Sequence, residues 1–381
     1  SFEVLVLPLF ILFGSVIAAS PSSSDIYEAF HRWLSRIPGG LVVANIFSCG
    51  MFAALCGSSP AVVAAVGKVG VPEMRRRGVG ARLATGAVTA GGTLGILIPP
   101  SVPLLIYGIV TEQSIGRLFL AGVVPGILLM LIFAAYVIIT EFFRKDRVVL
   151  VEHYTLRQKV EPVPRVLPFI AMILCILYAL YGGVATPSEI AAVAALAACL
   201  LVLLIYRIWS LPMWMEAFLG AIRESSMVLL IVAGSAVFSY TLSVLYIPQS
   251  MAEWVAELDL SRWVLMAAIN IATLVLGCFL PPVAIILMIM PILAPMLIQN
   301  AFDLIWFGIV LTINMEIGLI TPPVGVNLYV MKGVAPDVSL TNIFMGALPF
   351  VILMLLMIVL LCIFPGIVTW LPDYMMGPAT H

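Results

Sequence analysis

Charged residues are scarce in this chain, and their scarcity excludes an ordinary soluble domain. Only 10% of its 381 residues are Asp, Glu, Lys or Arg, whereas a soluble domain carries about 25%. Hydrophobic residues make up 63%, and the mean hydropathy is +1.19. Because a membrane span needs about 20 apolar residues, we predict a polytopic membrane protein. Uncharged stretches cover residues 4–24, 37–67, 83–111, 118–140, 166–188, 190–206, 225–252, 263–302 and 338–372.

Histidine is missing from every one of these apolar stretches, which argues against an enzyme. Catalysis inside the membrane calls for a close set of ionisable groups, such as His with Asp or Ser with His. His31, His153 and His381 all lie outside the stretches and are expected to be solvated. The six cysteines lie inside them without C-x-x-C spacing, so we predict buried small hydrophobes rather than disulfides or a metal site. No catalytic residue is predicted.

Proline, by contrast, occurs where a membrane helix should lack it. Gly95-Ile-Leu-Ile-Pro-Pro-Ser101 returns later as Gly318-Leu-Ile-Thr-Pro-Pro-Val324. Proline has no N–H, so the carbonyls of Gly95 and Gly318 lose their helical partners. Unpaired carbonyls survive in hydrocarbon only where protein, water or an ion satisfies them. One Pro-Pro pair would more often be a simple kink, but matched breaks in two repeats point to a transport site.

The basic residues predict that the two repeats are inverted. Clusters at 68–82 and 144–165 are placed in the cytoplasm. Segment 39–67 then enters and leaves from the cytoplasm and is too short for two spans, so we predict a re-entrant hairpin with its tip at 57–60. Counting crossings onward places Glu253 and Glu257 in a non-cytoplasmic loop. The first half therefore starts outside and the second half starts inside, an arrangement that many secondary transporters share.

The predicted fold class is an all-α polytopic membrane protein with two inverted repeats, each with a re-entrant helical hairpin and a broken transmembrane helix. The first repeat spans 1–142, with its hairpin at about 39–67 and its broken helix at about 83–111. A cytoplasmic loop at 143–165 and connecting transmembrane helices at 166–224 follow. The second repeat spans 225–381, with its hairpin at about 263–302 and its broken helix at about 304–332. Because Ser1 is not an initiator methionine, we expect an incomplete or processed N-terminus.

One acidic residue, Glu316, lies deep in the second broken segment. A carboxylate inside a membrane is a functional candidate by default, the alternative being a carboxylate hydrogen-bonded to the end of a broken helix. No second embedded carboxylate or histidine could form a relay with it. We therefore expect that Glu316 is not an obligatory proton carrier.

Five motifs together resemble the large membrane (M) subunit of tripartite ATP-independent periplasmic (TRAP) transporters. They are Pro38-Gly-Gly40, Gly57-Ser-Ser59, Pro72-Glu-Met74, Gly91-Gly-Thr-Leu-Gly-Ile-Leu-Ile-Pro-Pro-Ser101 and Asn314-Met-Glu-Ile-Gly-Leu-Ile-Thr-Pro-Pro-Val-Gly325. The resemblance implies an elevator-type, sodium-coupled importer of an organic acid in the bacterial inner membrane. It also implies two partners, a small membrane (Q) subunit and a periplasmic substrate-binding (P) protein. The family usually has a further span before residue 4, so fusion of the small subunit there stays open.

Sodium is a hard cation that prefers oxygen ligands, and the motifs supply oxygens where each hairpin tip would meet a broken helix. The predicted sodium-binding residues are Ser58, Ser59, Thr93, Gly95, Gly318, Thr321 and Gly325. Half-helix N-termini beyond the prolines carry partial positive charge and would face a substrate carboxylate. The predicted substrate-binding residues are Ser101, Asn314 and Asn327. Sodium ions are the expected cofactor, and no organic cofactor is expected.

Two other functional classes stay open. A stand-alone anion or citrate-type exchanger would share the inverted repeats and paired hairpins but would work without a binding protein. A membrane-embedded enzyme is disfavoured by the missing histidines. The net charge of −1 gives no indication of a nucleic-acid partner, and none is expected.

Overall fold

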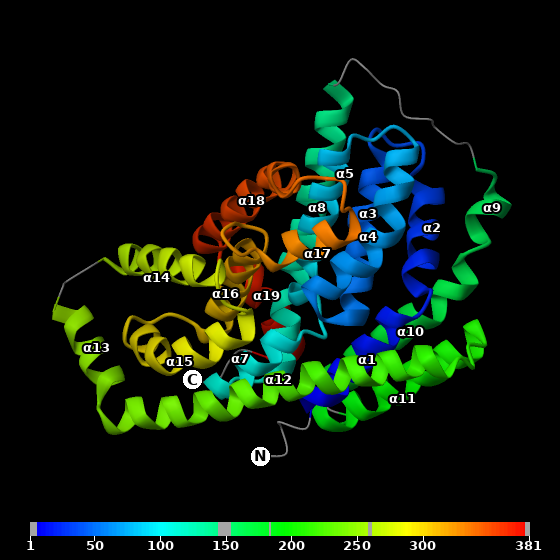
Figure 1. Cartoon of the computed structure of the whole chain (residues 1–381). Coiled ribbons are helices and arrows are strands. Elements are labelled where there is room, and N and C mark those ends of the chain that lie inside the picture. Colours follow the sequence, from blue (N-terminus) through cyan, green and yellow to red (C-terminus); the bar gives the residue numbers. More distant parts are fainter. Residues whose placement is uncertain (1–5, 144–153, 183, 258–260, 378–381) are drawn as a thin grey trace.

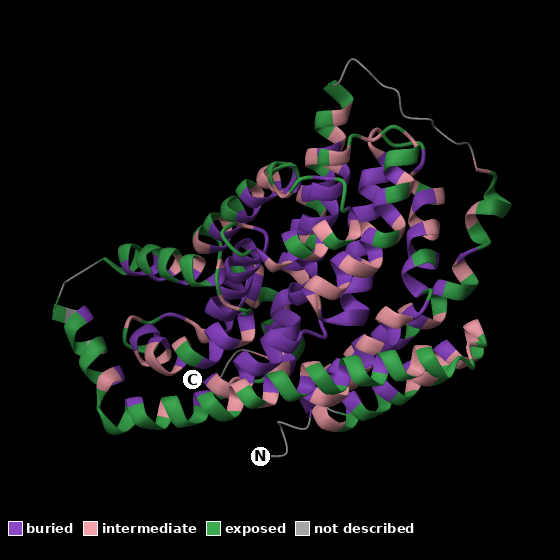
Figure 2. Cartoon of the chain, in the orientation of Figure 1, coloured by how far each residue is buried: buried purple, intermediate pink, exposed green. Residues whose placement is uncertain are grey.

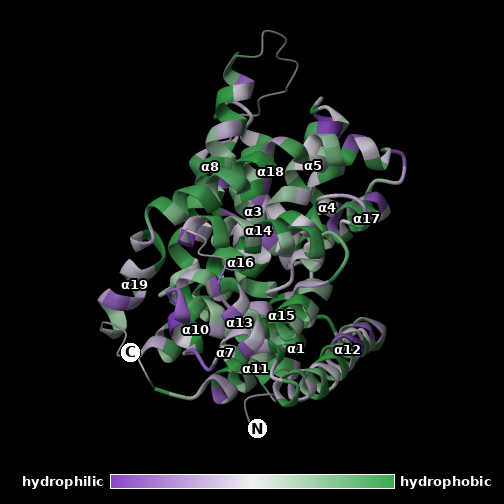
Figure 3. Ribbon diagram, turned by 90° about the vertical axis from the view of Figure 1, so that its left-hand side faces the viewer, coloured by the Kyte–Doolittle hydropathy of each residue, from purple (hydrophilic) through white to green (hydrophobic). Residues whose placement is uncertain are grey.

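The computed structural model describes residues 6–143, 154–182, 184–257 and 261–377, and every regular element in these ranges is helical. Within these described ranges, seven helices are long and apolar enough to cross a membrane. They become eight if the bent pair α1 (Val6–Ala19) and α2 (Ser22–Leu34), which meet at 65°, counts as one span. The predicted all-α polytopic fold class is confirmed. Figure 3 shows hydrophobic residues through the body of the molecule and hydrophilic residues near the ends of α4 and α17.

The first half contains a helical hairpin, here named hairpin 1, made of α3 (Gly40–Cys56) and α4 (Ser59–Arg76). The chain reverses at Gly57 and Ser58, where the sequence predicts a tip. Gly57 has φ +63°, and a Cβ at this position would lie 2.6 Å from the Pro100 carbonyl oxygen. Only glycine combines the left-handed conformation with so close an approach. Hairpin 1 therefore touches the Pro-Pro segment directly.

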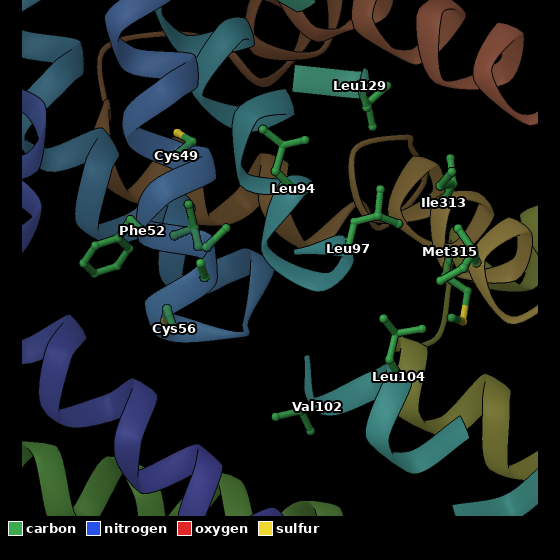
Figure 4. Packing of buried hydrophobic residues seen from close by; sticks show 14 of the residues in the cluster. Cys49, Phe52, Cys56, Leu94, Leu97, Val102, Leu104, Leu129, Ile313 and Met315 are labelled. Atoms are coloured by element: carbon green, nitrogen blue, oxygen red, sulfur yellow. The ribbon is translucent and has the colours of Figure 1, made fainter. Parts of the chain in front are cut away.

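A broken helix follows hairpin 1. It consists of α5 (Ala81–Gly92), α6 (Leu94–Leu97) and α7 (Val102–Thr111), with the Pro99–Pro100 bond in the cis form between α6 and α7. The Ser101 side chain accepts a hydrogen bond from the Leu104 N–H at 3.4 Å and caps α7. Figure 4 shows Leu94 and Leu97 of this segment between Phe52 of α3 and Ile313 of α16. The long helix α8 (Ile115–Phe143) completes the first half.

The middle of the chain differs from the sequence prediction. After α9 (Leu156–Val160), α10 (Val163–Tyr181) and α11 (Pro187–Tyr206), one continuous helix, α12 (Leu211–Val244), runs for 34 residues. The domain boundary predicted between residues 224 and 225 falls inside α12. Glu253 and Glu257 lie in a further short helix, α13 (Ile247–Glu257), and their placement on the non-cytoplasmic side stays a prediction. Figure 1 shows α12 lying crosswise to α8, and α12 packs against α1.

The second half repeats the pattern of the first. Hairpin 2 consists of α14 (Arg262–Gly277) and α15 (Pro282–Gln299), and the second broken helix consists of α16 (Leu304–Leu319) and α17 (Val326–Val334). The Pro322–Pro323 bond between α16 and α17 is also cis. The chain continues through α18 (Leu340–Ile363) and α19 (Gly366–Met376). Each half therefore holds a hairpin beside a helix that is interrupted at a Pro-Pro pair.

The two halves are packed into each other rather than merely side by side. A Cβ at Gly86 of α5 would lie 2.1 Å from the carbonyl carbon of Gly346 in α18, so these two helices meet backbone to backbone. Helix α4 packs against α17, and α7 packs against α15. Figure 2 shows buried residues concentrated where these helices meet, while much of α12 and α14 is exposed.

Two sequence predictions about single residues are wrong. Cys49 and Cys56 are buried as predicted, but Cys175 is exposed on α10. His31 is only 5% exposed. Its ring stacks on Tyr27 of the same helix, with centroids 5.9 Å apart. His31 is buried because α2 packs against α3 and α4. His153 and His381 lie outside the described residues.

Candidate functional site

The tip of hairpin 1 rests on the first broken helix. A Cβ at Gly95 in α6 would lie 3.2 Å from both the Ser58 carbonyl carbon and the Ser59 Cα. No residue larger than glycine fits at position 95 without moving this tip. The structure thus brings together Ser58, Ser59 and Gly95, three of the residues predicted to bind sodium. Their role as ligands stays a prediction.

Thr93 and Ser101 have hydroxyls that are used locally. The Thr93 Oγ1 donates to the Ala90 carbonyl at 2.6 Å and lies 3.8 Å from the sulfur of Met354 in α18. Ser101 caps α7 and is buried. Neither hydroxyl is hydrogen-bonded to the tip of hairpin 1. Of the first predicted cluster, Thr93 therefore reaches the other half of the molecule through the sulfur of Met354.

Hairpin 2 meets the second broken helix in a similar way. A Cβ at Gly318 would lie 2.3 Å from the Gly277 carbonyl carbon, and the Val324 N–H donates to the Cys278 carbonyl at 3.2 Å. The expectation of a free Gly318 carbonyl is wrong, because the Thr321 N–H donates to it at 3.2 Å. The chain tightens into a turn just before Pro322, so the nearer N–H replaces the one that proline lacks.

Two further members of the second predicted cluster lie at the same break. The Thr321 Oγ1 donates to the Ile317 carbonyl at 2.6 Å. Gly325 has φ +56° and begins α17. The break therefore contains a hydroxyl, several carbonyls and a left-handed glycine within a few residues, and their binding of sodium stays a prediction.

A buried polar chain joins the two halves. The Ser59 Oγ of hairpin 1 donates to the Glu316 Oε2 of α16 at 2.9 Å. The Asn327 Nδ2 of α17 donates to the same Ser59 Oγ at 2.7 Å. All three side chains are at most 1% exposed. The sequence singled out each residue separately, and the structure makes them one group, here named the Ser59 triad.

Asn314, also predicted to contact substrate, has a different environment. Its Nδ2 donates to the Asn270 carbonyl at 2.7 Å and to the Thr273 Oγ1 at 2.5 Å, both in α14. It borders a largely apolar cavity of about 360 Å³ between α14, α16 and α18. Ser101 and Asn327 do not line this cavity, so the structure does not bring the three predicted substrate residues to one surface.

Sequence reasoning missed Glu224, which borders a cavity of about 60 Å³ beside the tip of hairpin 1. Ser15, Cys56 and Ser58 line the same cavity. The predicted connecting transmembrane helices end at this residue, for which no role is predicted. A signal was present: Ala217, Ala221 and Val228 recur at helical spacing around Glu224, and α12 buries this face.

An ion pair lies at the polar end of hairpin 1. Arg75 of α4 donates to both carboxylate oxygens of Asp337, at 3.0 and 2.6 Å. This hydrogen bonding holds the pKa of the Asp337 carboxyl below its usual value. Asp337 stands between α17 and α18, so the pair ties hairpin 1 to the second half at its exposed end as well as at its buried tip.

Comparison with known proteins identifies the family. A model of the tripartite ATP-independent periplasmic transporter, DctM component, matches residues 1–367. The chain belongs to this family. The C4-dicarboxylate TRAP transporter large permease protein DctM of Pseudomonas aeruginosa is 37% identical over 98% of this chain and 87% of its own length.

Other relatives in the DctM family carry different substrate names. The isethionate TRAP transporter permease protein DctMQ of Oleidesulfovibrio alaskensis is 32% identical over 96% of this chain, which matches 58% of that protein. The sialic acid TRAP transporter large permease protein SiaM of Vibrio cholerae is 29% identical over 99% of this chain and 88% of its own length. The resemblance inferred from the motifs is thus confirmed.

A solved structure supports the fold. The YdaH transporter of Alcanivorax borkumensis matches 98% of this chain and 86% of its own length, with a TM-score of 0.63 and 15% identity. At this identity the match concerns the fold alone. The DctM-family chain described here therefore shares its helical architecture with a membrane transporter.

Proposed function

We propose that this chain imports an organic acid across the bacterial inner membrane by sodium-coupled secondary transport, as the large permease subunit of a TRAP transporter. The observation that carries the proposal is the match to the DctM family model over residues 1–367. Relatives are named for C4-dicarboxylate, isethionate and sialic acid, which share an acidic group. An organic anion suits a site built from helix N-termini and small polar side chains.

The proposed sodium ligands are oxygens at the two contacts between a hairpin tip and a broken helix. Hairpin 1 meets the first break at Ser58, Ser59 and Gly95, and hairpin 2 meets the second break at Gly318. Thr321 and Gly325 lie beside the second contact. Paired broken helices at matching positions of two repeats are the arrangement that secondary transporters use for substrate and coupling ions.

The proposed mechanism is an elevator in which the hairpins and broken helices move against the remaining helices. Two partners complete the proposed transporter, a small membrane subunit and a periplasmic substrate-binding protein. The name of one relative, DctMQ, and its greater length support a close association with a second membrane component. A permease site with few polar groups has little with which to discriminate one acid from another, so recognition is assigned to the soluble partner.

The test is uptake into proteoliposomes that contain this chain and its small subunit. Labelled substrate is supplied with an inward sodium gradient while the binding protein is titrated from zero. We expect little uptake at zero binding protein and none when potassium replaces sodium. Full-rate, saturable uptake without the binding protein would instead place the chain among stand-alone exchangers.

A further inference from the structure

We propose that the Ser59 triad is a binding site for one monovalent cation, formed by Glu316 and Asn327 together with Ser59, which also lies at the first contact between a hairpin tip and a broken helix. The site lies where hairpin 1 of the first half meets the second broken helix. The inference deepens the proposed function and rests on it only for the identity of the ion, sodium.

The first observation is a pair of oxygens without partners. Among the described residues, the Glu316 Oε1 and the Asn327 Oδ1 are buried and accept no hydrogen bond. The other polar atom of each group is held by the same hydroxyl, the Ser59 Oγ. Buried polar atoms almost always have a partner, and those that lack one call for an explanation such as an ion or a water. Here two such oxygens belong to groups joined through one serine.

The second observation is the direction of the hydrogen bonds. Ser59 has a single hydroxyl hydrogen, which it gives to the Glu316 Oε2, and it accepts from the Asn327 amide. The amide nitrogen is thereby turned toward Ser59. The Asn327 Oδ1 is left as an acceptor, and the Glu316 carboxylate bonded to the same hydroxyl also only accepts when ionised. The unpaired atoms are thus both oxygens, the ligand type that alkali cations prefer.

The third observation is charge. In the described ranges no basic side chain forms an ion pair with Glu316. A buried carboxylate without a counter-charge is strongly unfavourable. One monovalent cation makes the triad neutral, because the serine and the asparagine carry no charge. A divalent cation would leave a net positive charge in the same apolar surroundings, so the charge balance favours a monovalent ion.

The place of the triad gives the ion a mechanical role. Glu316 stands at the end of α16 and Asn327 at the start of α17, on the two sides of the second break, while Ser59 begins α4. An ion bound here contacts both halves of the broken helix and is held in place by hairpin 1. Its binding therefore stabilises the docking of hairpin 1 onto the second half.

The experiment measures sodium binding to the purified whole chain in detergent, without substrate or partner. Equilibrium binding of ²²Na⁺ is compared with choline at constant ionic strength for the wild type and for Glu316→Gln. We expect the variant to bind one sodium ion fewer per chain, because the amide keeps the shape and removes the charge. Wild-type stoichiometry in Glu316→Gln overturns the proposal.

A charge exchange separates ion binding from a purely structural role. The double variant Glu316→Gln with Asn327→Asp again has one carboxylate and one amide in the triad, in exchanged positions. We expect it to regain the lost sodium ion, whereas a double variant that binds no more than Glu316→Gln argues against the site. If Glu316→Gln does not fold, Asn327→Asp alone is informative. Its second carboxylate is expected to lower the sodium dissociation constant at this site at least tenfold, and an unchanged constant overturns the proposal.

The outcomes also separate this site from the proposed function. Sodium binding that loses one ion in Glu316→Gln, together with uptake that ignores sodium, would leave the site standing and overturn sodium coupling. Sodium-driven uptake together with an unchanged number of bound sodium ions in Glu316→Gln would overturn the site and leave sodium coupling standing. A wild-type chain that binds no sodium overturns the site, and a variant that changes only the pH dependence of thermal unfolding would assign the position to a proton.

Discussion

The two hairpins have similar positions in their repeats and very different surroundings. In hairpin 1, almost every residue of α3 is buried, because α2, α5 and α8 enclose it. In hairpin 2, α14 buries one face against α16 and makes few contacts with its own partner helix α15. The buried residues of α14 are Leu265, Met266, Ile269, Thr273 and Gly277. Both repeats thus contain a hairpin, but the neighbouring helices determine how tightly each hairpin is packed.

The helices that precede the hairpins show the same difference at a single matched position. By the repeat, Gly14-Ser15 of α1 corresponds to Gly234-Ser235 of α12. A Cβ at Gly14 would lie 2.4 Å from the Cys56 carbonyl oxygen of hairpin 1, whereas a Cβ at Gly234 would have nothing within 4 Å. At this matched position hairpin 1 lies directly against its preceding helix, whereas hairpin 2 packs against α12 through α15 at other positions. The firmly held hairpin is the one that carries the Ser59 triad.

The largest expected effect on stability comes from replacing each of these matched glycines by alanine. Gly14→Ala forces hairpin 1 away from α1, and overpacking of this kind costs about 1–3 kcal/mol. Gly234→Ala meets open space and removes backbone freedom in a helix, so we expect a gain of about 0.5–1 kcal/mol. Thermal unfolding of both variants in the same detergent measures the difference. Equal changes in Tm would show that the two hairpins are held alike.

The sodium dependence of uptake tests whether both hairpin contacts bind ions despite their unequal packing. Ser58→Ala and Thr321→Ala each remove a proposed oxygen ligand, and we expect each to raise the half-saturating sodium concentration about tenfold, or about 1.4 kcal/mol. Thr312→Ala is the matched control, because Thr312 also donates to its own helix, at 2.7 Å to the Gly308 carbonyl. Unchanged sodium dependence in both ligand variants would point to other ligands or another ion.

Hydrogen exchange measures the difference in packing directly. Amides in exposed, sparsely packed helices open with a lower free energy than those in a core. We expect the amides of α14 to exchange at least tenfold faster than those of α3 in the same sample. Glu316→Gln should speed exchange at the tip of hairpin 1 and leave α14 as it was. Equal protection of α3 and α14 would remove the distinction between the two hairpins.

Orientation in the membrane tests whether the hairpins enter from opposite sides. Single cysteines replace Arg76, Glu112 or Glu257 in a variant without other cysteines. The inverted-repeat topology predicts labelling by a membrane-impermeant maleimide in intact spheroplasts at 112 and 257 and none at 76. Labelling at 76 would contradict it.

The smallest expected effect concerns pH at the exposed ends of the hairpins. Hairpin 1 ends in the Arg75–Asp337 pair, whereas in hairpin 2 the Arg262 guanidinium lies 4.2 Å from the Phe302 ring centre. Arg75 lowers the folded-state pKa of Asp337. The pair's contribution is therefore complete above the ordinary Asp pKa and is lost as the pH falls through the lowered value.

Because the pair is exposed, its contribution is small. Asp337→Asn should slightly flatten the acid side of the Tm–pH profile, while Phe302→Leu should lower Tm without changing the shape of that profile. A profile that Asp337→Asn leaves unchanged would show that the pair contributes nothing measurable.

Local chemistry in the sequence was sufficient to locate the two breaks and the tip of hairpin 1. Proline removes a donor wherever it stands, and Gly57 marks a turn that other residues fit poorly. The Ser59 triad could not be located in this way. Its hydrogen bonds join residues 257 and 268 positions apart, and no periodicity in one segment reports a partner that far along the chain.

The errors have physical causes as well. The predicted boundary between residues 224 and 225 is not a helix end, because Ala217, Ala221 and Val228 keep one helical face of α12 buried across it. His31 appeared solvated because it lies in a polar stretch, but an amphipathic helix buries one face whatever its average polarity. In both cases the composition of a segment was a weaker guide than the face on which a residue falls.

The length of α12 has a consequence for the lipid around the protein. At 1.5 Å per residue its 34 residues extend about 50 Å, well beyond a hydrocarbon core of about 30 Å. Such a helix cannot stand upright within the core, and Figure 1 shows it lying across the direction of α8. A bilayer of different thickness would change how much of α12 it can cover. Reconstitution in lipids with shorter or longer acyl chains is therefore expected to change the transport rate. The change is expected to arise from the altered lipid contact of α12 rather than from a change in the packing of either hairpin.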